Sequence, residues 1–258
     1  MAQAIVNRNF PTFLWARRPQ SLEPYLARVT VAATPAELAS SSDVIGICVL
    51  GDADVEEVVL GPDGIHEGVR PGSVVVIHST VHPDTCRRVG RSLSRTGADV
   101  LDAPVSGGGA AAEAARLLVM VGGELHALER ARPILTAFGD PIVHLGGLGA
   151  GQTAKLINNL LFTDHLALAH RAVEVGSALG LDPDALVRTL QHGSGRSFAL
   201  GIYGGRRGTV ADGETPTAKM TALLAKDVSL VSDLLAARQV PGDLLIEVAR
   251  AGLRAITG

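Results

Sequence analysis

Residues 142–160 read IVHLGGLGAGQTAKLINNL, and the character of the chain changes within this glycine-rich stretch. Before it, short apolar runs alternate with helix-like segments, whereas after it only helical patterns continue to the end of the chain. Continuous apolar strands separated by helices are typical of a parallel sheet that is covered on both faces. We therefore expect an α/β domain over residues 1–146 and an all-helical domain over residues 147–258.

The individual elements follow from the same patterns. Short β-prone or apolar runs predict strands over 12–15, 29–32, 44–50, 73–77, 99–102, 117–121 and 142–145. Helical patterns cover residues 1–6, 35–39, 52–59, 83–95, 124–137, 152–179, 183–192, 218–238 and 241–256. The helix over 35–39 carries a predicted capping box, formed by Thr34 and Glu37.

Composition narrows the classes of function. The formal net charge is -3 and aromatic residues make up only 3% of the chain, so the basic surface and the stacking residues of a nucleic-acid-binding protein are lacking. The longest apolar runs are strand-sized, far short of the ~20 residues of a membrane-spanning helix. We expect a cytoplasmic protein that binds neither nucleic acid nor a membrane. Cys48 lies in an apolar run and is expected to be buried.

Arg17 and Arg18 follow the predicted strand over 12–15. In a dinucleotide-binding fold this position faces the adenosine ribose, and an arginine there can hold a 2′-phosphate because its guanidinium is planar and always charged. A solvated pair of loop arginines explains the same residues equally well.

Ligands of open α/β sheets bind at the carboxyl ends of the strands. Leu50-Gly51 follows the strand over 44–50 and His78-Ser79-Thr80 follows the one over 73–77, so both segments qualify as ligand contacts.

Two further segments contain groups suited to binding and to acid/base chemistry. Ser106, Gly107 and Gly108 follow a strand, and their hydroxyl and closely approachable backbone N–H groups suit a carboxylate. Lys155 and Asn159 are four residues apart and share one helical face. In a cleft, desolvation would lower the pKa of the lysine toward the range of a proton-transfer group. The alternatives are an ordinary strand-to-helix loop and a lysine that snorkels to the surface.

These segments together resemble the β-hydroxyacid dehydrogenase family, which includes the 3-hydroxyisobutyrate, tartronate-semialdehyde and 6-phosphogluconate dehydrogenases. The resemblance covers nearly the whole chain, in order. Its motifs are Ser79-Thr80, Asp102-Ala103-Pro104-Val105-Ser106-Gly107-Gly108, the glycines, lysine and asparagines of Gly149–Asn159, and Lys226-Asp227.

The resemblance implies a Rossmann-like domain followed by a helical domain, and an oxidoreductase that transfers a hydride between NADP, or NAD, and a small β-hydroxy acid or semialdehyde. It makes Lys155 the general acid/base and places the substrate at Ser106, Gly107, Gly108 and Asn159. The implied cofactor contacts are Arg17, Arg18, Leu50, Gly51, Thr80, Lys226 and Asp227. The family also implies a homodimer formed by the C-terminal helices.

The sequence departs from the family at its start. Family members begin with a strand and a Gly-x-Gly-x-x-Gly loop ahead of the helix, and neither is present here, since no glycine precedes Gly46. One alternative is therefore a catalytically inactive, truncated homologue that acts as a dimeric scaffold. Another is an enzyme like the imine reductases, in which the catalytic lysine is usually replaced, so Lys155 argues against it.

Overall fold

The computed structural model describes residues 1–209 and 218–257. The chain divides into two compact units, Met1–Lys155 and Leu156–Gly258.

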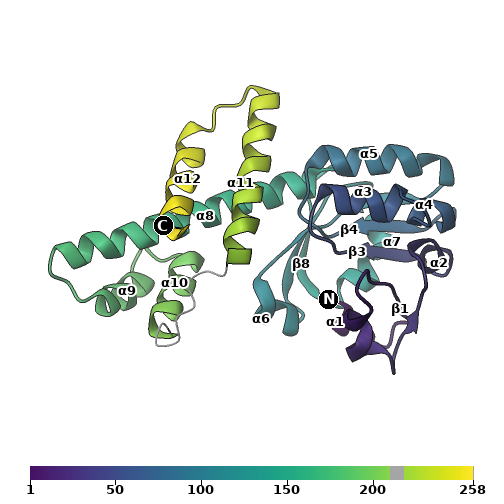
Figure 1. Cartoon of the computed structure of the whole chain (residues 1–258), viewed down its shortest axis with the longest axis horizontal. Helices are drawn as coiled ribbons and strands as arrows, with labels where there is room; N and C mark the ends of the chain where they lie inside the picture. Colours follow the sequence, from purple (N-terminus) through teal and green to yellow (C-terminus); the bar gives the residue numbers. More distant parts are fainter. Residues whose placement is uncertain (210–217, 258) are drawn as a thin grey trace. The chain divides into compact units, whose positions relative to one another are not determined.

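The first unit alternates strands with helices, as expected from the sequence (Figure 1). Its strands are β1 (Phe13–Leu14), β2 (Thr30–Val31), β3 (Val44–Ile47), β4 (Val74–Ile77), β5 (Asp99–Asp102), β6 (Val105–Ser106), β7 (Leu117–Val121) and β8 (Gly139–His144). Its α-helices are α1 (Ala2–Asn7), α2 (Pro35–Ser40), α3 (Asp52–Leu60), α4 (Ile65–Gly68), α5 (Pro83–Leu93), α6 (Gly108–Glu113) and α7 (Leu125–Leu135), and two 3₁₀ turns are η1 (Pro19–Tyr25) and η2 (Ser94–Thr96).

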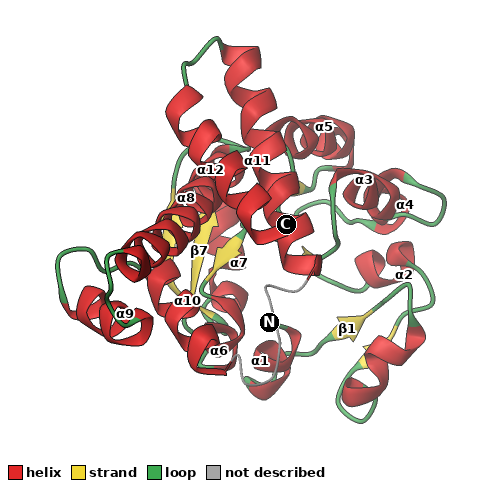
Figure 2. Cartoon of the chain, turned by 60° about the vertical axis from the view of Figure 1, so that its left-hand side comes forward, coloured by secondary structure: helices red, strands yellow, loops and turns green. Residues whose placement is uncertain are grey.

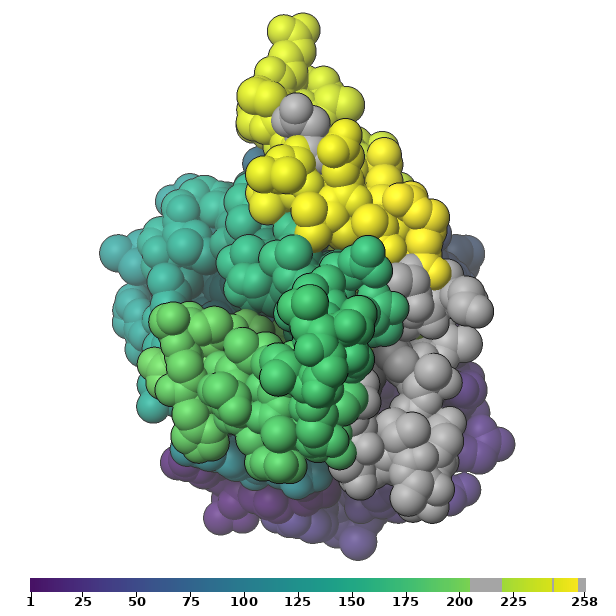
Figure 3. All heavy atoms as spheres, turned by 90° about the vertical axis from the view of Figure 1, so that its left-hand side faces the viewer, coloured from purple at the N-terminus to yellow at the C-terminus, as the bar shows by residue number. Residues whose placement is uncertain are grey.

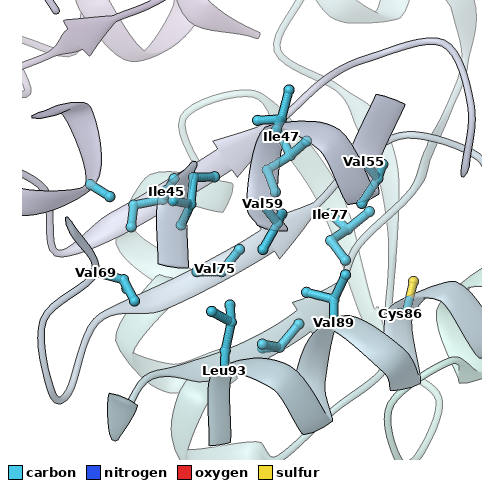
Figure 4. Packing of buried hydrophobic residues seen from close by; sticks show 14 of the residues in the cluster. Ile45, Ile47, Val55, Val59, Val69, Val75, Ile77, Cys86, Val89 and Leu93 are labelled. Carbon is cyan, nitrogen blue, oxygen red and sulfur yellow. The ribbon is translucent and has the colours of Figure 1, made fainter. Parts of the chain in front are cut away.

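Strands β3, β4 and β5 form a parallel sheet in that order, with Ile47 beside Ile77 and Ile77 beside Asp102. The central strand β4 is buried on both faces because its side chains alternate between two cores. Figure 4 shows one core, where Val75 and Ile77 pack with residues of α3 and α5. Val74 and Val76 pack into the other core, which α7 contributes to.

The remaining strands depart from a single parallel sheet. β1 and β2 pair in parallel as a two-stranded sheet, and β7 pairs in parallel with β8. β6, which we did not predict, runs antiparallel to β7. The chain continues from β5 into β6 in the same direction, and a bridge between Asp102 and Gly122 joins the end of β5 to the residue after β7.

The second unit is helical, and no strand occurs after β8 within residues 1–209 and 218–257 (Figure 2). Its helices are α8 (Ala150–Ala178), which begins in the first unit, α9 (Pro183–His192), α10 (Phe198–Thr209), α11 (Ala218–Arg238) and α12 (Asp243–Thr257). Leu156 and Leu160 of α8 pack with Val228 and Val231 of α11 and Ala249 of α12. Figure 3 shows one face of this unit, with α9 and the start of α10 in green and α12 in yellow.

Cys48 corrects one expectation. Strand β3 ends at Ile47, and the Cys48 side chain is exposed and lines a cavity instead of entering the core. The apolar run 44–50 therefore overstates the length of the buried strand. Within the described residues, no helix is long and apolar enough to cross a membrane.

Candidate functional site

The carboxyl ends of β3 and β4 are joined by a direct hydrogen bond. Val49 donates its backbone N–H to Ser79 Oγ over 2.7 Å, and Ser79 is buried. Leu50, the next residue after Val49, is 68% exposed, and Thr80, next to Ser79, is partly buried. The loops that contain the predicted cofactor contacts are therefore adjacent, as the rule for open α/β sheets requires.

A cavity of about 770 Å³ opens beside this edge. It is lined by Arg17 and Arg18 after β1, by Leu50 after β3 and by Ser79 after β4, with Trp15 and Ile47 among its apolar neighbours. Its size lies within the range of ligand pockets. The structure thus brings Arg17, Arg18 and Leu50 to one cavity, whereas Gly51 and Thr80 are not among its lining residues.

Arg17 is held by two carboxylates of α3. Its Nη1 lies 2.6 Å from Asp54 Oδ1 and its Nη2 lies 2.8 Å from Glu57 Oε2. The Arg17 hydrogen bond is the largest cause that lowers the pKa of Asp54. Asp54 also accepts the backbone N–H of Gly51, so it links Arg17 to the loop after β3. Arg18 is exposed.

His78, which the sequence placed at the ligand-binding end of a strand, lines the cavity. Its Nδ1 lies 2.7 Å from the carbonyl oxygen of Ala103, and its ring packs edge-on against Phe138. Burial lowers the pKa of His78 to about 4, so the ring is neutral near pH 7. The Nδ1–H therefore donates to Ala103, which leaves Nε2 as a hydrogen-bond acceptor.

The segment that resembles the family's substrate motif is divided between two environments. Asp102 is fully buried and accepts hydrogen bonds from the backbone N–H groups of Gly149 and Gln152, each over 2.6 Å. Ser106 lies in β6 and is partly buried, and Gly107 and Gly108 are exposed at the start of α6. Gly107 has φ +129°, a conformation that favours glycine.

Helix α8 carries Lys155 and Asn159, one turn apart. Lys155 is partly buried. In the second unit, Asn159 donates its Nδ2 to Asp227 Oδ2 over 2.6 Å, and Lys226 Nζ lies 3.2 Å from Asp227 Oδ1. Since the amide must donate to a carboxylate, its orientation is fixed. Lys226 and Asp227 are adjacent in the sequence and form an ion pair.

Sequence reasoning missed two polar residues, Asp102 as a helix cap and Gln152. Both are fully buried. The signal for Asp102 was available, because an aspartate at the end of an apolar strand needs a partner in the fold. Gln152 gave no such signal, since a glutamine near the start of a helix is usually exposed.

Two protein-family models match this chain, one for each of its two parts. Residues 1–146 match the model for the NAD-binding domain of 6-phosphogluconate dehydrogenase, and residues 149–255 match the model for the NAD-binding domain of NADP-dependent 3-hydroxyisobutyrate dehydrogenase. L-Threonate dehydrogenase of Cupriavidus necator is 32% identical over 90% of this chain and 78% of its own length. Mouse mitochondrial 3-hydroxyisobutyrate dehydrogenase is 31% identical over 93% of this chain and 73% of its own length.

A solved structure agrees with the sequence relatives. The crystal structure of 3-hydroxyisobutyrate dehydrogenase from Salmonella typhimurium superimposes with a TM-score of 0.84 at 28% identity. The match covers 99% of this chain and 88% of that one.

Proposed function

This chain belongs to the β-hydroxyacid dehydrogenase family, and on that premise we propose that it transfers a hydride between NADP and a small β-hydroxy acid or semialdehyde, with Lys155 as general acid/base. As a member of this family, the protein is a nicotinamide-dependent oxidoreductase that acts on a CH–OH group. The choice of NADP over NAD, the substrate and the residue roles are our proposals.

The cavity beside β3 fits part of a dinucleotide. It combines the guanidinium groups of Arg17 and Arg18 with the apolar side chains of Trp15 and Leu50, and these suit a phosphate and an adenosine respectively. Arg18 is the better phosphate ligand because Arg17 is already paired with Asp54 and Glu57. This pair of arginines favours NADP, and NAD is the alternative.

The remaining proposed cofactor contacts are Gly51, Thr80, Lys226 and Asp227. When bound, the nicotinamide supplies the hydride acceptor or donor for the reacting carbon of the substrate.

The chemistry of the protein itself is proton transfer. In the oxidative direction the neutral amine of Lys155 accepts the proton of the substrate hydroxyl, while the carbon that carries this hydroxyl loses a hydride to the cofactor. In the reductive direction the Lys155 ammonium returns the proton to the oxygen. Asn159 orients the reacting oxygen through its amide, which the bond to Asp227 holds in place. Ser106 and the N–H groups of Gly107 and Gly108 bind the substrate carboxylate.

The observation that supports this proposal most is the bond from Asn159 to Asp227. It joins two motif segments that lie far apart in the sequence, and it lies one helical turn from Lys155. A lysine followed one turn later by an amide of fixed orientation suits the reversible deprotonation of an alcohol. An imine reductase-like activity has no comparable support, because Lys155 is retained.

We propose that residues 1–146 form the dinucleotide-binding domain, which also supplies Ser106, Gly107 and Gly108 for the substrate, and that residues 147–258 form the substrate and dimerisation domain, which also supplies Lys226 and Asp227 for the cofactor. An inactive dimeric scaffold is the competing function. Such a protein would be dimeric in light scattering yet would bind neither cofactor.

The test is a fluorescence titration of the chain with NADPH and NADH, followed by turnover assays. The substrate panel contains 3-hydroxyisobutyrate, L-threonate, L-serine and, as a size control, 6-phosphogluconate. The proposal expects tighter binding of NADPH than of NADH and oxidation of one of the smaller acids. Failure of the chain to bind either cofactor, or turnover of 6-phosphogluconate alone, contradicts it.

A further inference from the structure

A buried carboxylate fixes the start of the helix that carries Lys155. Asp102, the last residue of β5, places Oδ1 2.6 Å from the N–H of Gly149 and Oδ2 2.6 Å from the N–H of Gln152. Gly149 directly precedes Ala150, the first residue of α8, and Gln152 is the third residue of that helix. Burial raises the pKa of Asp102, and the hydrogen bonds from the N–H groups of Gly149 and Gln152 oppose that shift, so the Asp102 carboxyl group caps the start of α8.

The backbone around this carboxylate leaves no room for side chains. A Cβ at Gly122 would collide with Asp102 Oδ1, and a Cβ at Gly151 would lie 2.8 Å from Asp102 Oδ2 and would collide with the carbonyl oxygen of Met120. Gly122 and Gly151 therefore allow the close approach of α8 to β5 and β7.

Gln152 connects the same helical turn to the loop after β4. Its side chain is fully buried, its Nε2 donates to the carbonyl oxygen of Ser79 over 2.8 Å, and its Oε1 accepts the N–H of Val81 over 3.1 Å. Because one end must donate and the other must accept, the amide orientation is fixed. The two hydrogen bonds hold the backbone on either side of Thr80, at Ser79 and Val81.

The network continues to the loop after β3. Ser79, whose carbonyl accepts from Gln152, accepts the N–H of Val49 on its hydroxyl. Buried hydrogen bonds therefore connect the start of α8 to the loops that contain Leu50 and Thr80. All of these residues lie in the unit Met1–Lys155.

We propose that Asp102 and Gln152 are positioning residues that hold the helix of Lys155 in a fixed relation to the cofactor loops. The inference rests on the proposed function, since it gives the network a role in the reaction. Lys155 lies one turn after Gln152, so a displaced first turn moves the reacting amine. A misplacement of about 1 Å can lower turnover by about 100-fold.

Gln152→Glu tests the network, because the new carboxyl has the same shape and donates a hydrogen bond only when protonated. Burial and the nearby Asp102 should raise the pKa of that carboxyl above the ~4.3 of an exposed glutamate. At low pH it can still donate to Ser79, and at high pH two oxygens face each other. We therefore expect kcat of this variant, relative to wild type, to fall as the pH rises, by roughly 10- to 100-fold, with substrate KM changed by less.

Gln152→Met, which can make neither bond, is expected to lower kcat at every pH. Gln191→Glu is the control, because the Gln191 side chain also donates to a carbonyl, that of Leu200, but lies in the second unit. It should leave kcat and its pH profile unchanged. Wild-type kcat and pH profile in both Gln152 variants would overturn the proposal.

Amide hydrogen exchange separates this outcome from failure of the proposed function. If the wild-type chain turns over no hydroxy acid, the proposed function fails, while exchange still reports on the network. We expect Gln152→Met to accelerate exchange at Val81 and in the first turn of α8 together. Unchanged exchange at both places, or acceleration at only one of them, would overturn the coupling.

Discussion

Replacement of Asp164 by asparagine is expected to stabilise the protein above neutral pH. Asp164 lies in α8 with only 3% of its surface exposed, and neither carboxylate oxygen has a hydrogen-bond partner among the described residues. Burial raises the pKa of Asp164 to about 6, although the neighbouring His165 opposes the shift. The folded state therefore favours the protonated acid.

The effect of Asp164 on the free energy of unfolding depends on pH, because its pKa differs between the folded and unfolded states. Because the folded pKa is raised, the contribution of Asp164 to stability is full below its unfolded pKa and is lost as the pH rises to about 6 and beyond. The rise in the pKa of Asp164 corresponds to ~3 kcal/mol as an upper limit, and the effective dielectric constant of about 20 at real buried sites reduces this to roughly 1–2 kcal/mol. The asparagine variant lacks this loss, since its side chain stays neutral.

Urea unfolding of both proteins at pH 5 and pH 8 measures the effect. The variant should be more stable than wild type at pH 8, by about 1–2 kcal/mol, and this advantage should shrink at pH 5. Asp233→Asn is the control, since it removes an exposed carboxylate from α11. A variant that is less stable at pH 8, or a difference from wild type that does not depend on pH, would refute the reasoning.

Two further predictions concern the glycine contacts of α8 and the cavity. Gly151→Ala should lower the free energy of unfolding by at least ~2 kcal/mol in urea because its Cβ collides with the Met120 carbonyl. Gly201→Ala, in open space within α10, should instead raise it by about 0.5–1 kcal/mol, and equal effects of the two would contradict the packing argument. Arg18→Ala should weaken NADPH binding in a fluorescence titration by roughly 10-fold or more, as expected for loss of a charged hydrogen bond, with NADH unaffected. Arg17→Ala should weaken NADPH binding less because Arg17 is already paired with carboxylates, and the opposite order would assign the phosphate to Arg17.

The sequence predicted most elements because their patterns are strong. The strand over 99–102 and the helices over 183–192 and 218–238 agree with β5, α9 and α11. Thr34 caps α2 as predicted, but the carboxylate of Glu37 accepts the N–H of Ala33 and not that of the N-cap residue. The capping pattern therefore predicted the start of α2 correctly but gave the wrong backbone donor for the Glu37 carboxylate.

Helix α10 and strand β6 are two elements that the sequence does not predict. Helix α10 includes Gly201 and Gly204, and glycine disfavours a helix interior, so local propensity opposes a helix there. β6 is only two residues long, too short for any periodic pattern. Tertiary contacts form both elements.

The candidate site shows the same division. Motif resemblance identified Asn159 and Asp227, which the structure joins. The position of Arg17 and Arg18 after a predicted strand indicated a cofactor contact, and the structure shows that both line one cavity. The sequence could not show that Arg17 is already paired with two carboxylates. Nor could it show that the Asp102 carboxyl binds the start of α8 instead of a ligand. Such contacts depend on distances between segments that no sequence pattern encodes.

The central claim is that Lys155 transfers the proton. The most direct measurement is single-turnover oxidation of the best substrate by wild type, Lys155→Met and Lys155→Arg at saturating NADP. Arginine keeps the positive charge but cannot give up its proton in this pH range. We predict that both variants bind NADPH within a few-fold of wild type yet react at least ~100-fold more slowly. A rate within a few-fold of wild type in either variant would contradict the account.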